Sequence, residues 1–279
     1  MRSRTLLVAG VGVAAVLALT GCAPNSITGS AAPQGAATQH TNVGTTAASV
    51  ADLGAAVQHN AAEKNSVHVD MNVTVPGAGA LTASGDMRFA GTKSAVHLTM
   101  DLPSVGNMEM VVVDGTFYMK LPAGLASLMG GSDDKPWAKV DLGSTDAITQ
   151  SLGSTADFAN QVDPTQMINQ IKSAGTITKV THETLNGQQT THYAITVDVA
   201  KLAGAEKQSM AGLGVTTLPF DIWVNSDNLP VRIITKVGYA DPVSGSSQQV
   251  AVTVNYTNWG QPVTVTAPPA DQVGTLDGH

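Results

Sequence analysis

Apolar side chains recur at every second position over most of the chain, which is the pattern of β-strands with one buried face. In the first run, residues 67–75, valine and methionine alternate with polar residues. The same pattern occurs at 81–89, 96–102, 108–112, 117–121, 137–140, 176–185, 190–199, 218–224, 231–239 and 250–256. Asp114-Gly115 and Asn186-Gly187 predict two-residue hairpin turns, and Gly85 predicts a β-bulge. We therefore expect an antiparallel meander of about ten or eleven strands.

Helical spacing replaces this alternation in a few segments. In the segment 47–64 the apolar residues form one stripe, with an acidic residue near the start and a basic residue at the end. Asp163 and Pro164 suit the N-cap and first position of a second helix, which Gly175 ends. Weaker helical patterning occurs in two further segments, 145–159 and 201–211.

Residues 47–270 contain no segment with linker composition, so we expect a single domain. A sheet of about ten or eleven strands has to curl or close. The helices are expected to lie on its concave face and cover its apolar side chains. The predicted fold class is therefore α+β, mainly antiparallel β, a strongly curved half-barrel with a polar tail at 271–279.

Composition and charge exclude some partners. Only 13% of the residues are charged and the formal net charge is −7, without a cluster of lysine and arginine. Nucleic acid binding relies on such clusters, and so does electrostatic attraction to anionic lipid head groups. Neither partner is expected, so any attachment to a membrane must have another physical basis.

The N-terminus has the form of a secretory signal, with Arg2 and Arg4 before an uncharged apolar run that ends at Leu19. The run is short for a membrane span, which takes about 20 apolar residues. Cys22 is the only cysteine of the chain and follows Leu-Thr-Gly. This position resembles the lipobox of bacterial lipoproteins, in which the cysteine is acylated and the peptide is cut before it.

Lipidation would make residues 1–21 a cleaved signal peptide and residues 22–46 a lipidated Cys22 with a flexible tether. The tether is made of small and polar residues, and its random-coil reach is about 25–30 Å. Two or more acyl chains suffice for stable anchoring. We expect an exported protein held on the outer face of the cell membrane. A secreted protein with a chance cysteine and an uncleaved membrane anchor are the alternatives.

Several motifs follow the tether in order: DGTFYMK at 114–120, Trp137 with Lys139-Val140, FDIWV at 220–224, NLPVR at 228–232, NYTNWGQPV at 255–263 and Pro268-Pro269. With Cys22 they resemble the LppX/LprG-type (LppX/LprAFG) lipoproteins of mycobacteria and related actinobacteria. The resemblance implies a fold like that of the LolA/LolB carriers, a half-barrel closed over by helices with a hydrophobic cavity between. It also implies binding and transport of acylated lipids or glycolipids in the cell envelope, without a cofactor.

The inward positions of the strands predict the side chains that line such a cavity. They are Met71, Val73, Met100, Met110, Phe117, Met119, Ile195, Phe220, Ile222 and Val252. Flexible methionine side chains suit a ligand of variable shape, and burial of an acyl chain contributes about 0.8 kcal/mol per CH₂. The same alternation also describes an ordinary filled sheet core. A register error of one residue would turn any such set outward.

Catalytic and metal-binding patterns are weak. His182, Glu183 and His192 could approach one another across the hairpin at 186–187, and His68 and Asp70 share a strand face. Neither group has a complete set of zinc ligands. Nucleophile elbows and glycine-rich phosphate loops do not occur in the sequence. We expect a protein that is not an enzyme and binds neither metal nor cofactor.

Two functions remain open. The first is a membrane-anchored envelope lipoprotein that binds acylated lipid or glycolipid in a hydrophobic cavity and carries or presents it, with an envelope transporter or acceptor protein as a further partner. The second is a non-enzymatic adaptor or envelope-stress sensor with a filled core that binds a protein partner. Lipid that co-purifies with the protein would distinguish the first from the second.

Overall fold

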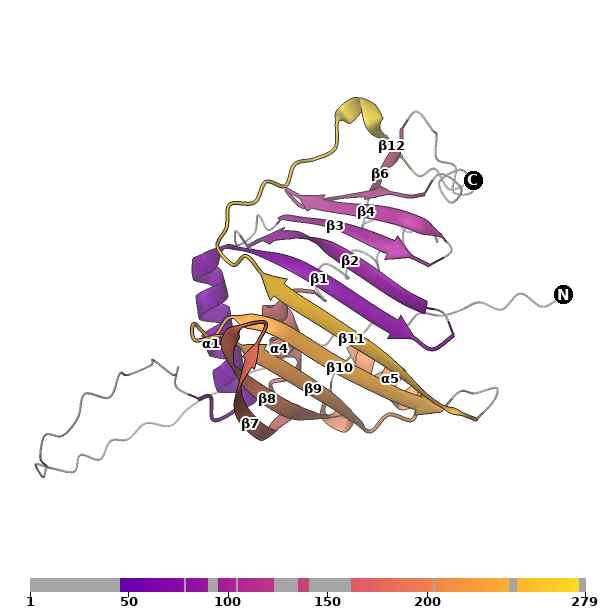
Figure 1. The fold of residues 1–279 in the computed structure, drawn as a ribbon. Helices are drawn as coiled ribbons and strands as arrows, with labels where there is room; N and C mark the ends of the chain where they lie inside the picture. The colour runs from indigo at the N-terminus through magenta and orange to yellow at the C-terminus, as the bar shows by residue number, and fades with distance from the viewer. Residues whose placement is uncertain are drawn as a thin grey trace, which may run out of the picture.

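The computed structural model describes residues 46–77, 79–89, 95–103, 105–122, 135–140, 162–202, 204–240 and 245–275. Twelve strands form one open sheet in the order β12-β6-β5-β4-β3-β2-β1-β11-β10-β9-β8-β7 (Figure 1). Their bounds are β1 Ser66–Val75, β2 Gly79–Arg88, β3 Ala95–Leu102, β4 Gly106–Val113, β5 Thr116–Lys120, β6 Trp137–Val140, β7 Gly175–Leu185, β8 Gln188–Asp198, β9 Thr217–Val224, β10 Pro230–Ala240, β11 Ser247–Thr257 and β12 Val273–Thr275.

The sheet consists of two meanders that meet at its centre. Strands β1 to β6 pair in sequence order on one side, and strands β7 to β11 do so on the other. The two halves join where β1 pairs antiparallel with β11, with His68 opposite Thr257. The predicted fold class, mainly antiparallel strands in one large curled sheet with few helices, is confirmed.

Three details differ from the expectations. The described sheet has twelve strands, not ten or eleven. Its last strand, β12, lies within the segment expected to be a polar tail and pairs in parallel with β6. Gly85 is not at a bulge, because β2 keeps an unbroken register with β1 and β3 there. Instead, β2 and β3 approach closely at Gly85, where an added Cβ would lie 1.9 Å from the carbonyl oxygen of His97.

The predicted hairpin turns fix the register of their strands. Asp114 and Gly115 have φ values of 50° and 75°, and Asn186 and Gly187 have 53° and 80°. Positive φ at both central residues is the mark of a type I′ turn, whose twist matches that of the flanking strands. These turns therefore determine which side chains of β4, β5, β7 and β8 face the core.

Helices α1 (Val50–Lys64), α4 (Pro164–Ile171) and α5 (Gly204–Gly212) accompany the sheet, with short 3₁₀ turns η2 (Val199–Lys201) and η3 (Ala270–Gln272). The predicted N-terminal cap of α4 forms at Asp163, and α1 has a further cap at Ser49 that was not among the predictions from the sequence. The Ser49 hydroxyl accepts from the backbone N–H of Asp52 at 3.1 Å, and the Asp163 carboxylate accepts from that of Thr165 at 2.8 Å. Helix α1 turns Val50, Leu53, Val57 and Ala61 inward.

The core lies on one face of the sheet, called the inner face here because α1 and α4 add side chains to it. One hydrophobic cluster runs along this face from β5 to β8 and includes residues of both helices. A smaller cluster on the opposite, outer face joins Ala95, Val111, Val113 and Trp137 to Val265 of the C-terminal segment. The C-terminal segment thus shields part of the outer face.

Several predictions lie outside the described residues. They are the signal peptide 1–21, Cys22 and its tether as far as residue 45, and the helical pattern at 145–159. Within the described residues, every helix is too short or too polar to cross a membrane.

Candidate functional site: the inner face of the sheet

The structure brings all ten predicted lining residues together in the cluster on the inner face. Eight of them are buried: Met71, Met100, Met110, Phe117, Met119, Ile195, Phe220 and Ile222. The other two, Val73 and Val252, are partly buried and pack against the same cluster. They lie directly opposite each other where β1 pairs with β11. The inward direction of these side chains therefore agrees with the sequence pattern, whereas their contact with a ligand stays a prediction.

Methionines gather on the inner face of β1 to β5, a region we call the methionine half. Its members are Met71, Met87, Met100, Met108, Met110 and Met119, each at most 9% exposed. Met100 is paired with Met108, and Met110 with Met119, so two methionine pairs cross β3 to β5. Met87 and Met108 were not among the predicted residues, although each shares the strand parity of a buried neighbour.

The inner face of β7 to β11 is lined differently, by aromatic and branched side chains held against the helices. The backbone N–H of Ala47, just before α1, donates to the Tyr193 hydroxyl at 2.9 Å. The Tyr256 hydroxyl donates to the Val162 carbonyl oxygen at 3.0 Å, just before α4. Burial raises the pKa of Tyr256 well above its usual 10.0, and the Asp163 carboxylate adds to this rise. Tyr256 therefore stays a hydrogen-bond donor at any physiological pH.

The difference between the two halves matters for binding. Figure 1 shows α1, α4 and α5 beside the half of the sheet formed by β7 to β11. Methionine is unbranched and polarisable, so it repacks around a new neighbour at a lower cost than tyrosine, isoleucine or valine. The methionine half is therefore the part of the inner face whose side chains can repack most easily.

In this structure the methionine half is closed. Met110 and Met119 have no accessible surface, and Met100 has only 3%. A side chain without accessible surface has no water-sized gap beside it, so no acyl chain fits against these residues in the present conformation. A ligand could reach them only after a change of conformation that exposes their side chains.

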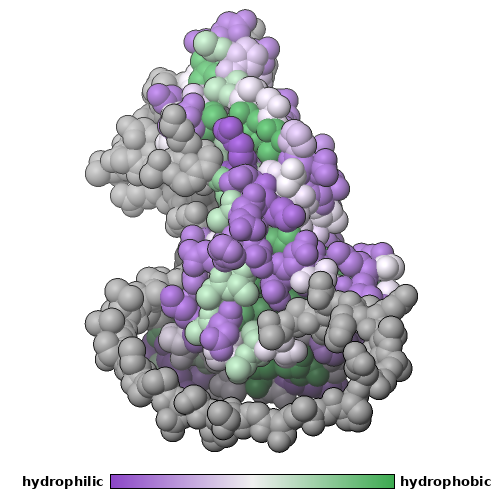
Figure 2. Space-filling view, turned by 90° about the vertical axis from the view of Figure 1, so that its left-hand side faces the viewer, coloured by the Kyte–Doolittle hydropathy of each residue, from purple (hydrophilic) through white to green (hydrophobic). Residues whose placement is uncertain are grey.

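Figure 2 gives a view of the surface on the side of α1 and β7. Hydrophilic residues cover most of the described surface at its centre, with smaller hydrophobic areas between them. Among the described residues, only Val105 and Leu213 are large hydrophobic side chains with more than a third of their surface exposed. Most large apolar side chains of the described residues are thus buried or partly buried.

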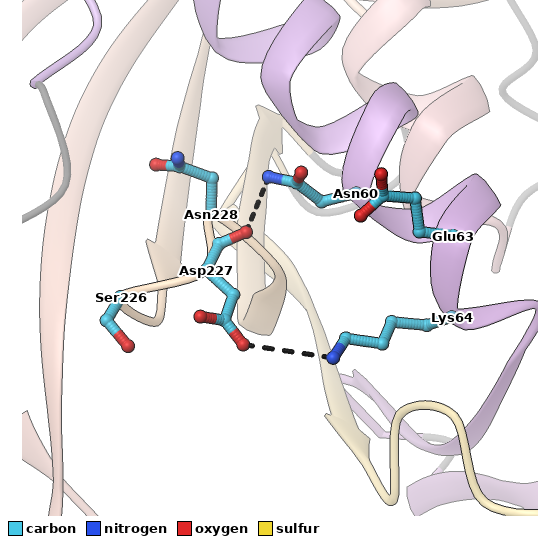
Figure 3. A pocket seen from close by; sticks show the side chains of 6 residues that line it. All are labelled: Asn60, Glu63, Lys64, Ser226, Asp227 and Asn228. Carbon is cyan, nitrogen blue, oxygen red and sulfur yellow. Dashed lines mark hydrogen bonds and ion pairs between the residues drawn. The ribbon is translucent and has the colours of Figure 1, made fainter.

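A polar pocket of about 390 Å³ lies between the C-terminal end of α1 and the β9–β10 turn (Figure 3). The side-chain amide of Asn60 donates to the Asp227 carbonyl oxygen at 2.6 Å. The Lys64 ammonium lies 4.0 Å from the Asp227 carboxylate. These contacts hold the β9–β10 turn against α1, so the polar residues of the pocket stabilise the fold. The pocket is separate from the apolar inner face.

The outer face carries two of the three histidines considered in the sequence, His68 and His192, whereas His182 shares the inward parity of Val180 on β7. His192 Nε2 lies 2.8 Å from Asp221 Oδ1, and His192 Nδ1 lies 3.6 Å from Glu183 Oε1. The His192 ring stacks on Trp223 with ring centroids 4.1 Å apart, and the Trp223 indole donates to Glu183. His182 contacts Thr191 instead, at 3.2 Å. Glu183 and His192 thus come together as expected, but His182 does not join them.

A second group on the outer face has the order of a catalytic triad. His68 Nδ1 lies 2.7 Å from Asp86 Oδ1, and His68 Nε2 lies 3.3 Å from the Ser84 hydroxyl. The Ser84 hydroxyl, however, donates to Asp70 at 2.8 Å. The N–H groups of β1 and β2 belong to the sheet ladder, which leaves no donor pair beside Ser84 to stabilise an oxyanion. The group is therefore better described as a polar cross-strand network.

A third polar group links β3, β4 and β5 on the outer face. The Lys120 ammonium lies 2.8 Å from Glu109 Oε1, and this hydrogen bond holds the pKa of Glu109 below its usual 4.5. His97 lies 3.6 Å from the other carboxylate oxygen. Across the described residues, histidine, cysteine and acidic side chains form no cluster of three that could hold a metal ion.

Comparisons with known proteins complete the description of the chain. No protein-family model matches it. An uncharacterized 31.2 kDa protein from Streptomyces griseus, in the rplA-rplJ intergenic region, is 27% identical over 177 residues, or 59% of this chain. The match spans only about half, 55%, of that relative's length.

Solved structures give weaker similarities. MucB in complex with MucA(peri) has a TM-score of 0.35 at 14% identity, covering 80% of this chain and 58% of that chain. The Pseudomonas aeruginosa MucA/MucB complex has 0.33 at 14%, covering 79% and 60%. A LolA superfamily protein from Nitrosomonas europaea has 0.25 at 10%, covering 74% and 91%. These TM-scores are below 0.5, so the chain is similar to these proteins without a shared function being indicated.

Proposed function

We propose that the protein is an exported lipoprotein, anchored to the outer face of the cell membrane through Cys22, that binds an acylated lipid or glycolipid on the inner face of its sheet. The observation that carries the proposal is the methionine half. Six of the chain's ten methionines lie together there, buried on five neighbouring strands. A lining of this kind can repack around hydrocarbon chains of different shape.

The proposed anchor is supported by the position of Cys22. The only cysteine of the chain stands where a lipoprotein would be cut and acylated. Mass spectrometry of the membrane-extracted protein should show acyl groups on an N-terminal Cys22, and Cys22→Ala should release the protein from the membrane. An unmodified Cys22 in a protein that remains membrane-bound would contradict the anchor.

The proposed binding mechanism is burial of acyl chains without chemistry. An acyl chain enters when the packing of the methionine half opens, and each buried CH₂ contributes about 0.8 kcal/mol. A chain of 16 carbons thus yields about 12 kcal/mol before the cost of opening the closed core is subtracted. This mechanism needs neither a metal nor a cofactor, in keeping with the LppX/LprG-type lipoproteins that the motifs resemble.

The test uses the full chain with Cys22→Ser, which lacks anchor acyl chains, so any lipid extracted from it is bound non-covalently. Native mass spectrometry of this protein should show a bound lipid. Met119→Trp should abolish the bound lipid, because the indole occupies the inner face. Val73→Phe, at a partly buried position, is a milder second variant. Thr99→Trp, on an exposed position of β3, is the matched control and should keep the lipid.

A second function is favoured by one specific observation, the complete burial of Met110 and Met119. A core that is filled by its own side chains suits a non-enzymatic adaptor or envelope-stress sensor, which binds a protein partner and carries no lipid. Under this alternative, the Cys22→Ser protein has no bound lipid and takes up none from vesicles of phospholipid or glycolipid. That result would reject lipid carriage while leaving the anchor intact.

A further inference from the structure

The two edges of the sheet differ strongly. One edge is β12, a strand of three residues that pairs in parallel with β6. The other edge is β7, which has eleven residues and, among the strands that the structure describes, pairs only with β8. A long edge strand presents a row of unpaired backbone N–H and C=O groups, which another strand can pair with. Edge β7 is therefore the part of the described sheet best able to recruit another strand.

The hairpin turn determines which backbone groups of β7 are free. Asn186 and Gly187 form a type I′ turn, so Leu185 and Gln188 exchange hydrogen bonds across it. Hydrogen-bonded pairs alternate along an antiparallel ladder. The N–H and C=O groups of Val180, His182 and Thr184 consequently point away from β8, toward the open edge.

The charges on β7 indicate what can pair there. Lys179 and Glu183 are exposed, and Thr181 stands between them. All three side chains lie on the outer face, since they share the parity opposite to Val180, which packs against the core. When two copies of this strand run antiparallel with Thr181 opposite Thr181, Lys179 of each copy stands opposite Glu183 of the other. The strand is thus complementary in charge to itself.

We propose that β7 pairs antiparallel with β7 of a second copy of this chain, about a two-fold axis at Thr181. In this register Val180 exchanges backbone hydrogen bonds with His182 of the second copy, so the free N–H and C=O groups meet. Thr181 and the Lys179–Glu183 pairs occupy non-hydrogen-bonded positions, where facing Cα atoms lie about 4.5 Å apart and side chains are closest.

The neighbours of Glu183 are compatible with this pairing. The Trp223 indole and His192 both contact Oε1 of Glu183, which leaves Oε2 for a lysine from outside. The β-bulge at Thr178 limits the ladder at one end, because the register with β8 shifts between Ile177 and Lys179. A lysine and a bulge on an edge strand normally discourage pairing with an arbitrary strand. In a second copy of β7, Glu183 stands opposite Lys179, so the lysine gains an opposite charge and does not oppose this pairing.

Disulfide trapping tests the register. In the full chain with Cys22→Ser, Thr181→Cys introduces a single thiol. At the two-fold axis this thiol faces the same thiol of the second copy, within the distance at which a disulfide can form. Mild oxidation should convert this variant to a covalent dimer at micromolar concentration. Thr184→Cys, exposed on the same strand but opposite residue 178 in this register, is the matched control and should remain monomeric. Equal cross-linking of both variants, or of neither, would overturn the proposed pairing.

Exchange of the charges at the proposed interface tests whether a second copy is the partner. Self-association of the same Cys22→Ser protein is measured by sedimentation equilibrium. Lys179→Glu places like charges opposite each other at two symmetric positions, so it should weaken self-association about tenfold or more. The double variant Lys179→Glu, Glu183→Lys restores both opposite-charge pairs and should recover the dimer. Lys236→Glu, on the interior strand β10, makes the same charge change and should have no effect. A monomer at all concentrations, or an equal loss in Lys236→Glu, would refute the proposal.

Discussion

Gly85 is the position where a single added methyl group should disturb the sheet most. It pairs with Val69 on one side and Leu98 on the other. An added Cβ would lie 1.9 Å from the His97 carbonyl oxygen and 2.9 Å from the Leu98 Cα atom. Both are backbone atoms, so no side chain can rotate to relieve the contact. Gly85→Ala must therefore separate β2 from β3.

The size of the effect follows from that contact. A tolerable distance is at least 3.0 Å, so the two strands have to separate locally by about 1 Å. Overpacking of this kind costs about 1–3 kcal/mol, and each ladder hydrogen bond that is lost adds about 0.5–1.5 kcal/mol. We expect Gly85→Ala to lower the free energy of unfolding by about 2–5 kcal/mol.

Urea denaturation followed by circular dichroism measures this change. Gly238→Ala is the matched control, since a Cβ at Gly238 meets only the Gln248 carbonyl oxygen, at 3.9 Å. Alanine there restricts the unfolded chain and should leave stability unchanged or raise it by about 0.4–1 kcal/mol. Equal unfolding free energies for the two variants would show that the close approach of β2 and β3 is absent in solution.

Three further predictions concern hydrogen bonds and charges. Tyr256→Phe leaves the Val162 carbonyl oxygen buried without its donor, so chemical denaturation should show a loss of about 1–3 kcal/mol. Burial raises the pKa of Asp163 above its unfolded value of 3.8. The contribution of this carboxyl group to stability therefore falls as the pH rises from the unfolded pKa through the folded pKa. Asp163→Asn should remove this part of the pH dependence of Tm. Lys120 lowers the pKa of Glu109, so the ion pair stabilises the fold above the unfolded pKa, and this contribution is lost as the pH falls through the folded pKa. Lys120→Met should lower the free energy of unfolding by about 0.2–1 kcal/mol at pH 7 and change it little at pH 3.

Much of the inner face could be predicted because strand alternation has a period of two. Once Asp114-Gly115 and Asn186-Gly187 fix the turns, each flanking strand has only two ways to face, and the apolar set decides between them. The side chains of Met110, Phe117 and Met119 are buried, as the alternation indicates. The predicted helix cap at Asp163 is equally local, since it depends on a residue only two positions away.

Other features depend on distant parts of the chain and could not be predicted from local pattern. β12 has only three residues, too few for any periodicity, and exists because it pairs with β6. A glycine within a strand, such as Gly85, indicates either a β-bulge or a close approach of two backbones. Only the position of β3 shows which of the two applies. Alternation also tells which way Met119 points but not what lies opposite, so it could not distinguish an open cavity from the closed packing observed.

The pairing of β1 with β11 has a consequence for how the protein is made. It joins the first strand of the chain to the last long one, so its ladder closes a loop that contains nearly the whole domain. Contacts this distant in sequence form slowly and late. A chain interrupted before Ser247 would leave one edge of β1 unpaired, and in β1 valine and methionine alternate with polar residues over ten positions. Such an edge can pair with the strands of other incomplete chains. Completion of the last strands is thus what protects this sequence from aggregation.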